Sequence, residues 1–385
     1  MIAYKSINLD NSDVRKQAAA ALSKHIITKE EFDRIYAAYP YDLYTPNFFV
    51  RVGLFLLTVL AALCCLGLFM LSSGGGDKSL GAMFIFFGVM AYAALELLIY
   101  VRGIFRAGSD DALLLVAGSM ILTGINILSS HIDPFMESGI VLALALWGFV
   151  RYTDRLMALV SYGAFLCLIF YQLGESPVGR ALLPFAVMAV SVVLYLLFTR
   201  LSALSLLRFY RSGLVLLRVA TLLSFYAAGN YYVVREVNAF ISHHPGAVAP
   251  GFLWWTLTGL VPILYIVRGV QKKDLVFLWT GLGLVAAAVF TVRYYYHILP
   301  AELAMIIGGS ILIAVAWSLI RYLHEPKYGF TSANIDDPDP ALLEGLPVEG
   351  LILAESFRPA TGQPMDKGVH FGGGTSGGGG AGGGY

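Results

Sequence analysis

Long, nearly uninterrupted apolar runs dominate the chain from residue 52 onward, and short polar or charged segments separate them. A hydrocarbon core about 30 Å thick takes roughly 20 apolar residues per helix, and the runs have about that length. They lack the alternation of a barrel strand, so each run predicts a membrane-spanning helix. The ten predicted spans are residues 52–72, 79–101, 111–129, 134–150, 154–173, 179–199, 213–233, 251–267, 273–292 and 300–320. The predicted fold is an all-α, polytopic transmembrane helical bundle of about ten spans, over residues 49–321.

The first 48 residues are polar and predict a small helical hairpin. One helix is expected from Ser12 to Lys24, and the spacing of Thr28 and Glu31 predicts a capping box that begins a second helix. Pro40 ends that helix. Because residues 1–48 are too few to bury a core of their own, we expect the hairpin to dock on the cytoplasmic ends of the spans.

Residues 322–385 form a tail rich in proline and glycine. Its final fourteen residues contain ten glycines, which offer almost no side chain to bury. We therefore expect a cytoplasmic tail that is disordered from about residue 371.

Lysine and arginine fall unevenly on the two sides that the ten spans define. With the N-terminus inside, 22 of the 26 basic residues lie in inside segments and four lie outside. Cytoplasmic loops are the ones that carry such an excess. The sequence therefore predicts that both termini are cytoplasmic.

Composition excludes a water-soluble globular enzyme, because 58% of the residues are hydrophobic and only 13% are charged. A net charge of +1 argues against a nucleic-acid partner. The three cysteines lie inside apolar runs, with no spacing that suggests a metal site or a disulfide framework. The sequence also lacks a P-loop, a zinc-protease pair and a serine nucleophile elbow. No catalytic, cofactor-binding or metal-ligating residue is assigned.

Two charged residues fall inside predicted spans, where each costs about 2.5–3.5 kcal/mol on insertion scales. Glu96 and Arg218 both lie about five residues from a cytoplasmic span end. Three explanations stay open: separate snorkelling to the interface, an intramembrane ion pair between Glu96 and Arg218, and a transport or proton-relay role. The amides of Asn126 and Asn230, taken as mid-span, are expected to bond neighbouring helices.

A ligand vestibule is predicted at the outer face, between spans seven, nine and ten. Arg235 and Arg293 are two of the four outer basic residues, and each follows or precedes a tyrosine cluster. His297 and Glu302 lie close behind and can exchange protons with a ligand. The alternative is that both arginines only anchor helix ends at the lipid headgroups.

The opening hairpin around Ile26–Glu31, the Tyr294–Tyr296 cluster and the tail from Phe371 to Gly374 together carry a resemblance. The chain resembles uncharacterised bacterial families of predicted multi-pass membrane proteins that have a small cytoplasmic domain ahead of the spans. The resemblance implies a bacterial inner (cytoplasmic) membrane protein. It implies no activity and no functional residues.

Three classes of function remain. The first is a non-enzymatic membrane protein that organises partners, through residues 1–48 or the tail, alongside the lipid bilayer. The second is a transporter or channel for a small solute, for which Pro184 and Pro262 offer helix breaks. The third is an enzyme that acts on a lipid-linked substrate at the outer face.

Overall fold

The computed structural model describes residues 2–23, 26–72, 77–129, 132–242 and 250–296, with positions 306, 309, 310, 313, 314, 317 and 321. Most of the tenth predicted span and all of the tail lie outside this described part. Within the described part the regular elements are helices. They are α1 (Ser6–Ser23), α2 (Lys29–Ala38), α3 (Phe48–Ser72), α4 (Asp77–Arg102), α5 (Ser109–Leu128), α6 (Pro134–Tyr152), α7 (Arg155–Gly174), α8 (Pro177–Ser202), the 3-10 helix η1 (Ser205–Tyr210), α9 (Arg211–Gly229), α10 (Tyr231–Ser242), α11 (Gly251–Lys272) and α12 (Leu275–Tyr295).

Nine helices of the described residues are long and apolar enough to cross a membrane, with η1 and α9 together counted as one. Many of their large side chains face outward. Leu57 and Leu60 of α3, for example, are 62% and 59% exposed. In water such a surface is a liability, but hydrocarbon chains solvate it. The structure therefore supports the predicted all-α, multi-pass membrane protein.

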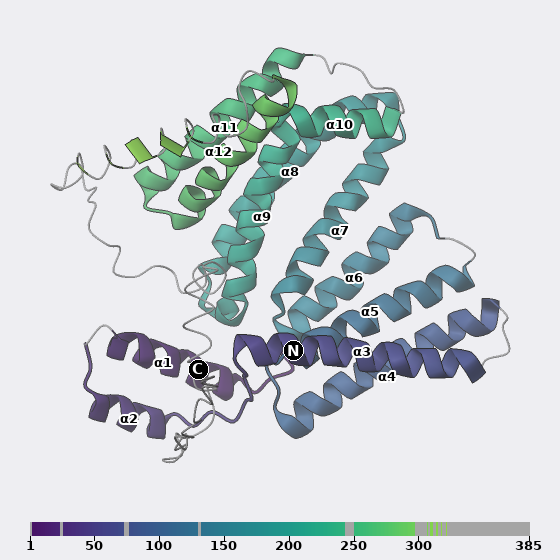
Figure 1. Ribbon diagram of the computed structural model, residues 1–385, viewed down its shortest axis with the longest axis vertical. Helices are drawn as coiled ribbons and strands as arrows, with labels where there is room; N and C mark the ends of the chain where they lie inside the picture. The colour runs from purple at the N-terminus through teal and green to yellow at the C-terminus, as the bar shows by residue number, and fades with distance from the viewer. Residues whose placement is uncertain are drawn as a thin grey trace, which may run out of the picture.

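The spans pack mainly as neighbouring antiparallel pairs, α4 with α5, α6 with α7, α8 with α9 and α11 with α12, while α3 lies against α5. In Figure 1 the spans from α3 to α9 open out in chain order, and α10 crosses the end opposite α1 and α2. We call these two ends the module end and the α10 end.

Two of the pairs turn at the module end through a short local sequence. Thr153 and Lys273 adopt left-handed conformations, with φ of 54° and 55°, and close α6 and α11. The next residue, Asp154 or Asp274, then accepts a hydrogen bond from the backbone of α7 or α12. Such caps satisfy amide groups that a helix start leaves unpaired.

The N-terminal module, residues 2–47, docks on the module end. Its helix α2 begins with the predicted capping box, in which Thr28 and Glu31 bond each other's backbone. Ala3 N–H donates to the Arg151 carbonyl at 2.8 Å, and Tyr44 forms an isolated parallel bridge with Ile104. Tyr4, Leu9 and other module side chains join the hydrophobic cluster of the first spans. These contacts support the expected docking of residues 1–48 on the span ends.

Two predicted helix boundaries were wrong. The first helix begins at Ser6 rather than Ser12, because Leu9 is buried against the bundle and tertiary packing extends the helix. Predicted span seven, residues 213–233, ends at Gly229. Asn230 there adopts an extended conformation and a separate helix, α10, follows.

Candidate functional site

Three aspartates gather at the module end, and sequence reasoning did not single them out. Asp110 accepts a hydrogen bond from Ala107 N–H at 2.9 Å, and Asp154 accepts one from Met157 N–H at 2.8 Å. Asp111 forms an ion pair with Arg51 at 2.5 Å. We call Asp110, Asp111 and Asp154 the carboxylate cluster.

The carboxylate cluster borders a small pocket that also meets the N-terminal module. The pocket holds about 10 Å³, room for roughly one water molecule, and its wall includes Tyr4, Arg106 and Tyr152. Asp110 is only 6% exposed. Burial and the neighbouring charge of Asp111 raise the pKa of Asp154 from 3.8 to about 6. Burial likewise raises the pKa of the Tyr4 hydroxyl.

In the sequence these aspartates match the acidic residues that ordinarily begin a helix, so the sequence analysis did not predict them as site residues. A usable signal was present: Asp110–Asp111 and Asp154 both follow predicted inside loops that carry arginine, at Arg106 and Arg151. Only the fold shows that the two loops meet.

Glu96 and Arg218 are not brought together, so the ion pair between them, one of the three explanations left open, does not form. Glu96 accepts two bonds from Arg151, from Nε at 3.1 Å and from Nη2 at 3.0 Å. The hydroxyls of Tyr152 and Tyr92 donate to the same carboxylate at 2.7 and 3.1 Å. Arg151, near the end of α6, reaches this carboxylate of α4 with its side chain, and Arg218 of α9 does not.

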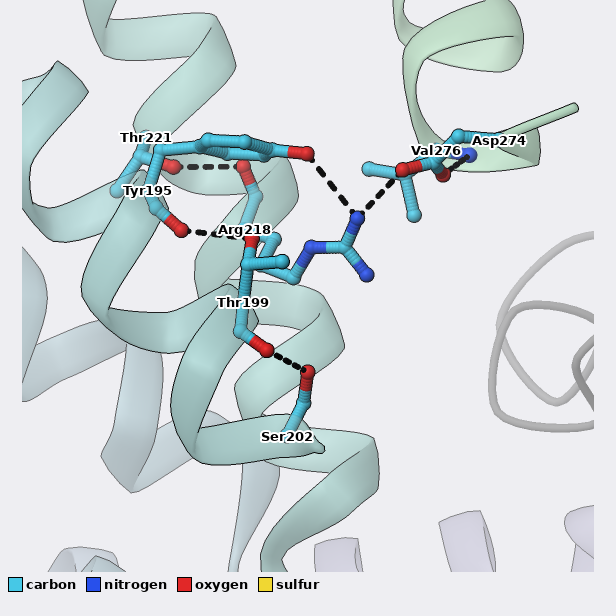
Figure 2. Close-up of polar contacts among 7 residues, drawn as sticks. All are labelled: Tyr195, Thr199, Ser202, Arg218, Thr221, Asp274 and Val276. Carbon is cyan, nitrogen blue, oxygen red and sulfur yellow. Dashed lines mark hydrogen bonds and ion pairs between the residues drawn. The ribbon is translucent and has the colours of Figure 1, made fainter. Parts of the chain in front are cut away.

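Arg218 has its own partners in the second half of the bundle. Its guanidinium donates to the Asp274 carboxylate at 2.6 Å and to the Tyr195 hydroxyl at 3.1 Å. Figure 2 shows the group reaching from α9 between Tyr195 of α8 and the turn that begins α12. The contact joins α8, α9 and the start of α12. The Arg218 side chain is only 11% exposed, so its charge is largely removed from solvent.

Asn230 is the polar centre of the α10 end. Its amide nitrogen donates to Tyr226 and Thr291 hydroxyls, both at 2.9 Å, and its amide oxygen accepts from Tyr232 and Val233 N–H. The side chain is 2% exposed. The expected helix–helix hydrogen bond is present, but Asn230 lies at a span end rather than in mid-span. Asn126 also bonds a neighbouring helix, through Glu137 at 3.4 Å.

The predicted vestibule is described only in part. The Arg235 guanidinium lies 4.9 Å from the centre of the Tyr295 ring, and Arg293 lies in the last turn of α12. Around them a cluster of rings joins α10, α11 and α12, with Tyr231 stacked on Trp255 at 4.7 Å. His297 and Glu302 lie outside the described residues.

Within the described ranges, no three histidines, cysteines or carboxylates come together in a way that suits a metal ion. Cys64, Cys65 and Cys167 are free thiols on the outward surface of the spans. Comparison of the chain with protein-family models, curated proteins and solved structures gave no match.

Proposed function

We propose that the protein is a non-enzymatic membrane protein that organises partner proteins through its N-terminal module. The observation that carries this proposal is the way the module is held. Separate contacts fix it to the bundle at Gly103–Phe105, Arg151 and Arg208, while α2 buries none of its residues. Because the module is fixed to the bundle while α2 is not covered by it, α2 is placed where a partner protein can bind. In the proposal the membrane is the bacterial inner membrane, and both termini lie in the cytoplasm.

The polar side chains of the spans support the same proposal. A transporter needs facing polar groups near the midplane. Glu96 lies six residues, roughly 9 Å, from the end of α4, and its carboxylate is occupied by Arg151 and two tyrosines. Arg218 is bonded to the capping residue of α12, and Asn230 lies at a span end. These groups act as supports between helices.

Site-specific crosslinking tests this function in cells. A photoreactive residue at Glu30 or Arg34 of α2 is expected to give a discrete adduct with a partner, identified by mass spectrometry. The matched control is Leu206, which is 86% exposed on η1 at the same end. The purified partner should bind the full-length protein, and the double variant Glu30→Lys, Asp33→Lys should weaken binding at least tenfold without changing thermal unfolding. Equal adducts at α2 and Leu206 would contradict the proposal.

A small-solute transporter is the second candidate, favoured by Pro262. This proline is fully buried inside α11, where it leaves the Thr258 carbonyl without its helical donor. Thr258 is buried too, and its hydroxyl accepts a hydrogen bond from Tyr231 N–H at 3.0 Å. A freed carbonyl beside a helix break is a place where transporters bind ions or solutes.

The predicted vestibule gives the experiment for this candidate. A solute panel is screened by thermal shift with the parent protein and with Arg235→Gln, Arg293→Gln and Pro262→Ala. Transport predicts a solute that stabilises the parent, loses affinity in one of the variants, and crosses proteoliposomes that hold the parent. Absence of flux for every stabilising solute would leave partner organisation as the better account.

A further inference from the structure

Helix α10 is too short to cross a membrane, and it lies where longer helices end. Its 12 residues extend about 18 Å, whereas the hydrocarbon core is roughly 30 Å thick. It packs against α8, α9 and α11, and in Figure 1 it crosses the end of the bundle. A helix in that position lies either in water above the membrane or in the border layer of the lipid.

The apolar residues of α10 share one side of the helix. That side consists of Val233, Val234, Val237, Phe240 and Ile241, and the polar side of Arg235, Glu236, Asn238 and Ser242. Of the apolar side the bundle buries Val234 alone, and Phe240 is 74% exposed. Among the described residues, the protein therefore covers this side only in part. Helices with two such sides lie in the plane of a membrane interface.

Contacts at the start of α10 fix the direction in which the apolar side points. Tyr231 stacks on Trp255 of α11 at 4.7 Å between ring centres. Tyr232 meets Tyr294 of α12 edge to face at 4.8 Å. A rotation of α10 about its axis that covered Phe240 would break both contacts. The exposed phenylalanine is therefore held on the outside of the bundle.

The neighbouring helix α11 carries an outward apolar stripe that reaches the same end. Phe252, Leu260 and Ile263 fall on one side of α11 and are 84%, 44% and 57% exposed. They belong to the surface of the spans that hydrocarbon chains solvate. Trp255, which α10 contacts, lies only three residues beyond Phe252. The lipid-facing surface of α11 therefore continues to the level of α10.

We propose that α10 lies in the border layer between lipid headgroups and acyl chains, with Phe240 and the apolar side among the chains. The polar side faces the headgroups and water. The partner of this surface is the lipid layer itself, at the end of the molecule opposite the N-terminal module. The rings of α10, α11 and α12 then lie at headgroup level, where tyrosine and tryptophan are enriched in membrane proteins.

Spin-label accessibility of the full-length protein in lipid nanodiscs tests this contact. Cys64, Cys65 and Cys167 are replaced by alanine, and one new cysteine is then labelled at a time. The label in Phe240→Cys should collide readily with oxygen, which dissolves in hydrocarbon. Its collisions with a water-soluble nickel chelate should be several-fold rarer than those of the label in Asp33→Cys, on the exposed surface of α2. The label in Leu260→Cys gives the reference for a lipid-facing span.

The matched control is Glu236→Cys, one turn earlier on the polar side of α10. Its label should meet nickel more often than the label in Phe240→Cys, and the reverse order would overturn the orientation. Nickel collisions in Phe240→Cys as frequent as in Asp33→Cys would place α10 in water and overturn the proposal. Shielding from both oxygen and nickel would overturn it too, because protein would then cover Phe240. Val237→Cys, on the same apolar side, repeats the measurement if Phe240→Cys does not fold.

Discussion

At the scale of single residues, partly buried charges are held by partners that lie far away in the chain. Glu96 meets Arg151 across 55 positions, Arg51 meets Asp111 across 60, and Arg218 meets Asp274 across 56. Each contact joins separate helices near a span end. Breaking such a pair on one side leaves a charge that is poorly solvated.

A double-mutant cycle on Arg218 and Asp274 should show strong coupling. Arg218→Gln and Asp274→Asn each leave one charge in a largely buried contact, so each should lower the free energy of unfolding by up to about 3–5 kcal/mol. The double variant should recover about 1–3 kcal/mol of the summed loss. The Asp274→Asn variant can still accept the hydrogen bond from Val276 N–H, so it removes the charge of Asp274 without removing the cap of α12. Unfolding in mixed detergent micelles gives the free energies.

The matched control for that cycle is Glu96→Gln with Arg218→Gln. Because these two side chains have separate partners, their losses should add within about 0.3–0.5 kcal/mol. Coupling of Glu96 to Arg218 as strong as that of Arg218 to Asp274 would contradict the contacts described above.

Gly108 is a position where the backbone requires glycine. Its φ is 88°, and a Cβ atom there would overlap the carbonyl oxygen of Arg51. Gly108→Ala should therefore lower the free energy of unfolding by at least about 2 kcal/mol. Gly118→Ala is the control, since Gly118 lies in α5 with nothing within 4 Å of its Cβ position. That change should stabilise by about 0.5–1 kcal/mol, and a similar loss in both variants would refute the steric explanation.

At the scale of elements, one side chain decides where a helix stops. Asn230 interrupts what the apolar pattern predicts as a continuous span, because its amide caps α10 and bonds Thr291 of α12. Asparagine competes with helical hydrogen bonding in this way when its local partners are well placed.

Asn230→Ala should cost about 2–3 kcal/mol of stability, since it removes the cap and leaves the Tyr226 and Thr291 hydroxyls short of a partner. Asn126→Ala removes one long bond to Glu137 and should cost less than about 1 kcal/mol. Thermal unfolding of both variants beside the parent checks this order. The reverse order would show that Asn230 is not the main support of the α9–α10 junction.

At the scale of the whole molecule, the loops predicted to be cytoplasmic are those that the module touches. Gly103–Phe105, Arg151 and Arg208 all contact residues 3–44. The structure contains no membrane, so the side on which this end lies is still a prediction from the charge bias.

Reporter fusions test that orientation. Fusions after Asp77, Gly174 and Ala247 should report outside, and fusions after Gly108, Asp154 and Lys273 should report inside. Enzymatic reporters active on only one side of the membrane give the readout. An inside signal at Gly174 would mean that the number of spans before it is wrong.

The sequence by itself determined the class of this protein and much of its local structure. Apolar length is a property of each segment alone, and so the nine described spans appear near their predicted positions. Capping is equally local, which is why the Thr28–Glu31 box could be predicted.

Only the tertiary structure decided which charges meet. Glu96 and Arg218 were identified correctly as charges in need of an explanation, but their partners depend on which helices are neighbours. The carboxylate cluster was missed for the same reason, since Asp111 and Asp154 belong to different helix pairs and line one pocket only in the folded bundle. Hydrophobic periodicity carries no information on that arrangement, because lipid accepts any apolar face and helix pairing is set by contacts between side chains.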